Sequence, residues 1–328
     1  MLKIRNITVD PPLALAPMVG LSHSALRTLI LELGGVGLLF TEMLSAKRLP
    51  QENDRVSPCL IRTENEYPLF YQVFLNNSLP VEAAVDKLHS MGAHGIDINL
   101  GCPAPKLRKW GAGCYLVKNR SAVAAIISTF RKCTELPLSV KIRLGERNRE
   151  KDYLDLCRLI EDQGADCLTI HARFNDDKFC RKPTWNWIAK ARESISIPII
   201  ANGGIFTVED ALNCLQISGA DGLMIGRGAV MRPWLLWEIA SVHFNGGETC
   251  SSNVPYDVYL RFFDLLTERF SPERRLGRLK QFTHYFSGSH VFGHQLASAV
   301  QISTTMDQAR EAARRFFESN STSDALLR

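Results

Sequence analysis

The chain has 328 residues, of which 45% are hydrophobic and 22% charged, a balance that supports a folded core and excludes an intrinsically disordered protein. Its net charge of +5 permits an anionic partner without requiring one. The nine cysteines include no CxxC pair, which argues against a zinc site and against the disulfide framework of a secreted protein. The sequence has no signal peptide and no membrane-spanning apolar run, so we expect a cytoplasmic protein without metal or membrane attachment.

The first three-quarters of the sequence repeats one pattern, in which a short apolar run is followed by a longer helical stretch. The eight apolar runs span residues 13–16, 38–41, 69–74, 95–99, 139–143, 167–171, 197–202 and 222–225. Helices are expected between them, including residues 24–33, 81–91, 122–133, 153–163 and 208–217. Eight such units predict an α/β fold, a closed (β/α)8 TIM barrel. The alternative, an open doubly wound sheet, would be expected to carry a GxGxxG motif after an early strand, and the sequence has none.

The composition changes after the last strand–helix unit. Residues 246–253 combine glycine and serine without periodicity, which is typical of a linker. Beyond them helices are predicted at residues 255–270 and 309–317, and Ser271-Pro272 indicates a further helix start. We therefore predict a TIM-barrel domain over residues 1–245, a linker over residues 246–253 and a small C-terminal helical-bundle domain over residues 254–328.

Reactive side chains are concentrated at the predicted carboxyl ends of the strands, where barrel enzymes carry their chemistry. These ends hold Cys102, Lys141, Arg143, His171 and Arg173. A lone strand-end histidine is commonly a structural residue, but a structural barrel has no need of so many reactive groups around one rim. Their coincidence predicts an active site.

A phosphate site is predicted after the seventh and eighth strands. Asn202, Gly203 and Gly204 follow one strand, and Gly226 and Arg227 follow the other. Glycines allow backbone N–H groups to approach a phosphate closely, and an arginine adds a charge-assisted hydrogen bond. The alternative is that the glycines only turn the chain. The pattern favours a phosphorylated cofactor or substrate.

Three side chains nearer the barrel centre suit a flavin. Lys141 can place a positive charge beside the ring system, and Gln72 can both donate and accept hydrogen bonds. His171 can donate to the cofactor or to the substrate. These side chains would suit the ring system of such a cofactor, while the phosphate site leaves a phosphorylated cofactor or substrate open.

Cys102 lies between Gly101 and Pro103, in the loop after the fourth strand. A loop cysteine in a cationic site is suited to act as a proton donor or nucleophile. Cys114 is the alternative, and Cys102 is preferred because it lies closer to the strand end.

Two basic segments suit nucleic acid. Residues 106–120 include Lys106 and Lys109, contain Trp110 and have no acidic residue, and the C-terminal segment carries Arg274, Arg275 and Arg278. Basic side chains interleaved with aromatic rings are typical of nucleic-acid surfaces, although a solvated charged loop is the alternative for the first segment. Basic segments in both predicted domains favour a large polyanion.

The strand-end sequences resemble those of the tRNA-dihydrouridine synthases over about residues 14–235. The matching segments are Ala16-Pro17-Met18, Thr41-Glu42-Met43-Leu44-Ser45-Ala46-Lys47, Asp97-Ile98-Asn99-Leu100-Gly101-Cys102-Pro103, Val140-Lys141-Ile142-Arg143-Leu144-Gly145, His171-Ala172-Arg173, Ile200-Ala201-Asn202-Gly203-Gly204-Ile205 and Met224-Ile225-Gly226-Arg227-Gly228. The Asn-x-Gly-Cys-Pro element is the most specific of them.

This resemblance implies a flavoenzyme that reduces the C5=C6 bond of specific uridines in tRNA to 5,6-dihydrouridine. It further implies FMN bound in the barrel, NADPH or NADH as the electron donor and tRNA bound by the helical tail. Hydride would pass from reduced FMN to C6 and a proton from a thiol to C5. The expected protein is a monomer with tRNA as its partner.

Residue roles follow from the same resemblance. Cys102 would be the catalytic acid. The flavin would be bound by Pro17, Met18, Gln72, Lys141, His171, Asn202, Gly203, Gly204, Gly226 and Arg227, and the substrate by Asn99, Arg143, Lys106, Lys109, Arg173, Arg274, Arg275 and Arg278. Phe174-Asn175 replaces the usual Thr-Arg of the family, so a substrate contact in that loop is in question.

Two alternative functions stay open at this point. One is an FMN barrel oxidoreductase acting on a free pyrimidine, similar to dihydroorotate dehydrogenase, which would need neither the helical tail nor the basic segments. The other is a non-catalytic RNA-binding barrel, against which the presence of Cys102, Lys141 and His171 argues.

Overall fold

The computed structural model describes residues 1–54, 56–76, 81–177, 181–244 and 255–324. Its barrel strands are β3 (Leu13–Leu15), β4 (Leu39–Phe40), β6 (Leu69–Phe74), β7 (Gly95–Leu100), β8 (Leu138–Arg143), β9 (Cys167–His171), β10 (Ile199–Asn202) and β11 (Gly222–Ile225). They pair in parallel in the order β3-β11-β10-β9-β8-β7-β6-β4. A bridge between Ala14 and Leu38 joins the two ends, and the Leu15 N–H donates to the Leu38 carbonyl at 3.0 Å. The predicted TIM barrel is therefore confirmed.

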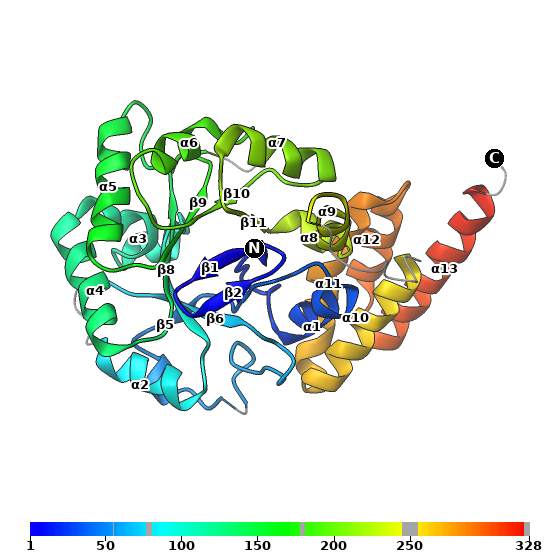
Figure 1. The fold of residues 1–328 in the computed structure, drawn as a ribbon. Coiled ribbons are helices and arrows are strands. Elements are labelled where there is room, and N and C mark those ends of the chain that lie inside the picture. Colours follow the sequence, from blue (N-terminus) through cyan, green and yellow to red (C-terminus); the bar gives the residue numbers. More distant parts are fainter. Residues whose placement is uncertain (55, 77–80, 178–180, 245–254, 325–328) are drawn as a thin grey trace.

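Helices surround this barrel (Figure 1). They are α1 (Ser24–Leu33), α2 (Glu82–Ser90), α3 (Pro105–Lys109), α4 (Arg120–Cys133), α5 (Glu150–Asp162), α6 (Asn186–Arg192), α7 (Val208–Ser218), α8 (Arg227–Met231) and α9 (Leu235–His243). The amphipathic pattern explains their packing: in α4, Val123, Ile126, Ile127 and Phe130 recur at helical spacing and are all buried. Short elements complete this part: β5 (Leu44–Ser45), which pairs with β6, and the 3-10 helices η1 (Leu49–Gln51) and η2 (Gly113–Lys118).

An N-terminal hairpin that the sequence analysis did not predict closes the amino-terminal end of the barrel. Strands β1 (Leu2–Ile4) and β2 (Ile7–Val9) pair in antiparallel fashion. Their buried side chains share one apolar cluster with inward-facing barrel residues such as Phe70 and Met224. In Figure 1 the hairpin lies across the centre of the ring of helices. The hairpin therefore packs its apolar side chains against the interior of the barrel at this end.

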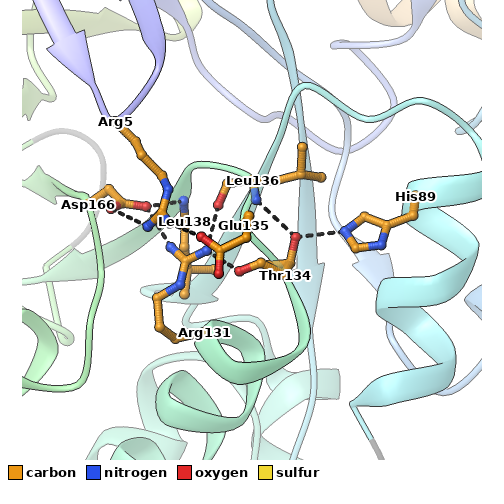
Figure 2. A network of polar contacts seen from close by, with 8 residues as sticks. All are labelled: Arg5, His89, Arg131, Thr134, Glu135, Leu136, Leu138 and Asp166. Atoms are coloured by element: carbon orange, nitrogen blue, oxygen red, sulfur yellow. Dashed lines mark hydrogen bonds and ion pairs between the residues drawn. The ribbon is translucent and has the colours of Figure 1, made fainter.

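A network of polar contacts also holds this end together (Figure 2). Arg131 of α4 donates to Asp166 at 2.8 Å and to the Leu136 carbonyl at 3.0 Å, and it also contacts the Thr134 carbonyl. Asp166 in turn accepts the Leu138 N–H at 2.8 Å. Arg5, in the hairpin turn, pairs with Glu135 and lies near Asp166. The network ties the hairpin, α4 and the start of β8 to one another.

The chain ends in a helical tail. Its elements are α10 (Pro255–Arg269), η3 (Pro272–Arg274), α11 (Arg275–Phe286), η4 (Ser287–Ser289), α12 (Gly293–Ile302) and α13 (Met306–Asp324). An aromatic core holds them: Phe262 and Phe282 stack with ring centroids 3.8 Å apart, and Tyr259 packs beside Phe282. The segment after Ser271 begins as a 3-10 turn without a side-chain cap and becomes α-helical at Arg275, slightly later than predicted. The C-terminal helices are thus confirmed.

The tail packs directly on the barrel beside α1 (Figure 1). Arg261 of α10 pairs with Glu32 of α1 at 2.6 Å, and the His23 ring stacks on Phe262 with centroids 6.0 Å apart. The predicted linker at residues 246–253 lies outside the described residues, so the division into two domains stays a prediction. In the described part of the chain, no helix is long and apolar enough to cross a membrane.

Candidate active site

A cavity of about 420 Å³ opens at the carboxyl ends of the strands. Fourteen of the predicted site residues line it: Pro17, Met18, Gln72, Asn99, Cys102, Lys141, Arg143, His171, Arg173, Asn202, Gly203, Gly204, Gly226 and Arg227. They come from seven different strand ends, and the register explains their convergence, since Asn99 lies opposite Lys141 and Arg143 opposite His171. The closed barrel therefore brings together residues that are far apart in the sequence.

The charged side chains among the described lining residues of this cavity are all basic. Lys141, Arg143, Arg173 and Arg227 line it, and no aspartate or glutamate is among the described lining residues. Burial lowers the pKa of Lys141 to about 8, an effect that the neighbouring Asp97 opposes. Lys141 donates to Asn202 at 2.8 Å, and Asn202 donates to the Met224 carbonyl at 2.7 Å. A lysine held in this way can present its charge to an anionic or electron-rich ligand.

His171 is neutral in this environment. Burial, followed by the charges of Lys141 and Arg143, lowers its pKa well below the ordinary value. Nη1 of Arg173 lies 3.0 Å from Nε2 of His171. Because a guanidinium can only donate, Nε2 must accept, so the ring proton resides on Nδ1.

Arg143 and Arg173 are anchored by backbone carbonyls. Arg143 donates to the Phe174 carbonyl at 3.1 Å, and Nη2 of Arg173 donates to the Arg181 carbonyl at 2.7 Å. Both side chains are almost completely buried. Guanidinium groups held in this way lose little further side-chain entropy when they contact a substrate.

The Cys102 loop is anchored by Asn99. The Asn99 side-chain oxygen accepts the N–H of Gly101 at 3.3 Å and that of Cys102 at 3.0 Å. Cys102 lines the cavity and is partly accessible, whereas Cys114 does not line it and is buried behind the loop. Burial raises the pKa of the Cys114 thiol to about 11. Of the two thiols, Cys102 is the one placed to reach a ligand.

Glycine is required at the two positions of the predicted phosphate site after β10. Gly203 and Gly204 have φ angles of +111° and +76°. A Cβ atom at Gly203 would lie 2.6 Å from Cδ2 of His171, and one at Gly204 would lie 2.5 Å from Cγ of Pro183. Both the backbone conformation and the close packing therefore favour glycine. Arg227 lies nearby over the Phe206 ring, with its Cζ 5.5 Å from the ring centroid.

Comparison with known proteins identifies the family. The dihydrouridine synthase family model matches residues 14–322. A probable tRNA-dihydrouridine synthase 1 of Synechocystis is 34% identical over 73% of this chain and 67% of its own length. A tRNA-dihydrouridine(16) synthase of Aquipseudomonas alcaligenes is 32% identical over 82% of this chain and 88% of its own length.

The chain belongs to the dihydrouridine synthase family. This result confirms the predicted enzyme class, that of the tRNA-dihydrouridine synthases, and favours neither alternative. Among solved structures, a 2-naphthoyl-CoA reductase complex has a TM-score of 0.56 at 12% identity, covering 80% of this chain and 55% of that one, a similarity of fold alone.

The helical tail also contributes to the cavity, which the sequence analysis did not foresee. Gln281 and Tyr285 of α11 line its mouth. Gln281 donates to the Val19 carbonyl at 3.1 Å, and a Cβ atom at Gly20 would lie 2.4 Å from the Gln281 side-chain oxygen. No sequence pattern indicates this contact, because it depends on how the tail packs on the barrel.

The predicted tRNA-binding residues outside the cavity fall into two groups. Lys106 and Lys109 lie on α3, immediately after the Cys102 loop, and Lys106 is 5.1 Å from the Trp110 ring centroid. In the tail, Arg274 is exposed, whereas Arg275 donates to the Phe270 carbonyl at 2.6 Å. Arg278 lies over the Phe270 ring and donates to the Arg274 carbonyl at 2.8 Å. Arg275 and Arg278 thus make contacts around Phe270, whereas the exposed Arg274 side chain lies 3.6 Å from the Glu273 carboxylate.

Among the described residues, no group of three or more histidine, cysteine, aspartate or glutamate side chains could hold a metal ion. The seven cysteines in that part of the chain are free thiols.

Proposed function

We propose that this enzyme reduces the C5=C6 bond of uridines in tRNA, with FMN bound in the cavity, NADPH or NADH as the electron donor and Cys102 as the acid. The observation that carries the proposal is a cationic cavity, free of acidic residues in the described chain, with Cys102 at its edge. Its volume of about 420 Å³ is in the range of ligand pockets. Family membership supports the same assignment.

The residues present fit a flavin mononucleotide. Its phosphate would suit the glycine turn at Gly203 and Gly204 and the guanidinium of Arg227. Asn202 and Gly226 line the cavity beside these residues and would also contact the phosphate end of the cofactor. Pro17 and Met18 provide an apolar wall, and Gln72, Lys141 and His171 supply polar groups for its ring system or ribityl chain. When bound and reduced, FMN would supply the hydride for C6 of the uracil.

The chain's own residues account for the rest of the reaction. Asn99, Arg143 and Arg173 are suited to hold the target uracil, since their donors can stabilise negative charge on a uracil oxygen. The Cys102 thiol would give its proton to C5. Because a stacked base cannot enter the barrel mouth, the uridine must leave its stack first.

The proposal extends to the rest of the molecule. Lys106, Lys109, Arg274, Arg275 and Arg278 would bind tRNA phosphates, with residues 254–328 forming the tRNA-binding domain. A monomeric state and a cytoplasmic location are part of the same proposal.

The decisive experiment uses tRNA lacking dihydrouridine. The purified protein should carry noncovalent FMN that acid or heat releases, and with NADPH it should form dihydrouridine in tRNA but not reduce free uracil, uridine monophosphate or orotate. Reduction of a free pyrimidine at a comparable rate, or the absence of flavin, would contradict the proposal.

A further inference from the structure

Asp97 is a buried carboxylate beneath the cavity, next to residues that line it. It lies in the middle of β7, faces the barrel interior like Asn99 two residues later, and has 0% exposure. It does not line the cavity. An ionised group is costly to bury, so its partners are informative.

Two neighbouring strands provide those partners. In the strand register, Gln72 of β6 and Ser139 of β8 lie directly opposite Asp97 on either side. Nε2 of Gln72 donates to one carboxylate oxygen at 2.7 Å, and the Ser139 hydroxyl donates to the other at 2.5 Å. Burial raises the pKa of Asp97 to about 6, against the opposing effects of Ser139, Gln72 and Lys141.

The hydrogen bonds continue from Gln72 to the Cys102 loop. Because Nε2 of Gln72 is directed at Asp97, its Oε1 is directed the other way and accepts Nδ2 of Asn99 at 2.8 Å. This contact in turn orients Oδ1 of Asn99 toward the backbone N–H of Cys102. Each amide can be oriented in only one way, since a reversed Gln72 would place an oxygen against the carboxylate.

We infer that Asp97 is a positioning residue that orders the Cys102 loop through a relay of two side-chain amides, Gln72 and Asn99. An acceptor at position 97 sets the amide orientation of Gln72, Gln72 sets that of Asn99, and Asn99 holds the loop backbone. The importance of this order for catalysis rests on the proposed role of Cys102, whereas the ordering of the loop does not.

Hydrogen exchange tests the relay directly in flavin-free protein without tRNA. The informative fragment is Asn99-Leu100-Gly101-Cys102-Pro103, because proline has no N–H and the fragment therefore reports few amides beyond those of Gly101 and Cys102. In Asp97→Ala we expect these two amides to exchange about tenfold faster or more. Asp97→Asn should stay near the wild-type rate, because its oxygen can still accept from Gln72 while its NH2 donates to Ser139.

Thr169→Ala is the matched control. Thr169 is a fully buried polar residue of β9, opposite Lys141 in the register, and its hydroxyl has no hydrogen-bond partner among the described residues. Its replacement by alanine leaves a cavity of comparable size in the barrel, but the exchange rates of the Gly101 and Cys102 amides should not change. Wild-type exchange in Asp97→Ala, or equally fast exchange in Asp97→Asn, would overturn the relay.

If Asp97→Ala does not fold, Gln72→Ala takes its place. It removes the acceptor of the Asn99 side-chain NH2, so the loop amides should exchange faster than in Thr169→Ala, and equal rates would overturn the inference. In holoenzyme, Asp97→Ala should slow the tRNA-dependent oxidation of reduced flavin about tenfold or more while NADPH-dependent reduction changes less than about threefold. Faster loop exchange with an unchanged tRNA-dependent rate would overturn the link to catalysis and would count against Cys102 as the acid.

Discussion

The two ends of the barrel are built from the same strands but in opposite ways. At the amino-terminal end, a hairpin fills the interior with apolar side chains, and the charges of Arg5 and Arg131 are matched by Glu135 and Asp166. At the carboxyl-terminal end, cations line an open cavity without an acid among its described lining residues. These charges of the first end are paired within the chain, whereas the cations of the second end line the cavity that we propose binds an anionic cofactor. We therefore expect the first end to govern stability and the second to carry the chemistry.

The largest effect should come from the Cys102 thiol. Cys102→Ala should still bind flavin and accept electrons from NADPH, but its tRNA-dependent step should slow by about 10²–10⁴-fold, the usual contribution of a general acid. Rapid-mixing absorbance measurements of each half-reaction test this. Cys114→Ala, which alters a buried thiol behind the loop, should retain most activity. The opposite result for the two cysteines would transfer the acid to Cys114.

A change at the opposite end should affect stability and not chemistry. Arg131→Ala removes the ion pair with Asp166 and two contacts to loop carbonyls, so the free energy of unfolding should fall by about 2 kcal/mol. Urea denaturation measures this loss. Arg158→Ala, which removes an exposed helix pair with Asp155, should cost less than about 0.5 kcal/mol. A loss of activity per folded molecule in Arg131→Ala would contradict the expectation that the amino-terminal end affects stability alone.

The basic residues outside the cavity should govern tRNA affinity. Charge reversal of Lys106, Lys109 and Arg274 together should weaken tRNA binding by about tenfold or more, and each lost phosphate contact should lower the salt dependence of log affinity by about one unit. Filter binding over a range of salt concentrations measures both. NADPH oxidation without tRNA should not change. We leave Arg275 and Arg278 intact because their contacts around Phe270 are structural. Unaltered tRNA affinity in this triple variant would contradict the proposal that these three side chains contact tRNA phosphates.

The smallest effect concerns pH. The pKa of Lys141 is lowered to about 8, so the side chain is protonated below that pH and loses its charge above it. If its charge favours FMN, affinity should decrease about two- to tenfold as the pH rises through this value. Fluorescence titration of flavin-free protein measures it. Lys141→Met should bind more weakly at neutral pH and show no such decrease. A wild-type affinity that rises with pH would contradict the assignment.

Sequence reasoning located most of the barrel because its strands are continuous apolar runs bounded by turn residues. The runs at 69–74, 167–171 and 222–225 coincide with β6, β9 and β11. The run at 197–202 begins too early, since β10 starts at Ile199, after Pro198, which lacks an N–H for the ladder. The N-terminal hairpin escaped prediction because its strands have three residues each and are buried only through contact with the barrel.

The sequence by itself determined the barrel, the family and the residue types at the strand ends, because periodicity and motif spacing are local properties of a chain. Only the tertiary structure decided which of two cysteines reaches the cavity, that Gln281 and Tyr285 of the tail line its mouth, and that Asp97 is connected to the Cys102 loop. These facts depend on contacts between elements that are distant in sequence. Accessibility, charge environment and the direction of a side-chain amide are set by such contacts, and no local pattern encodes them.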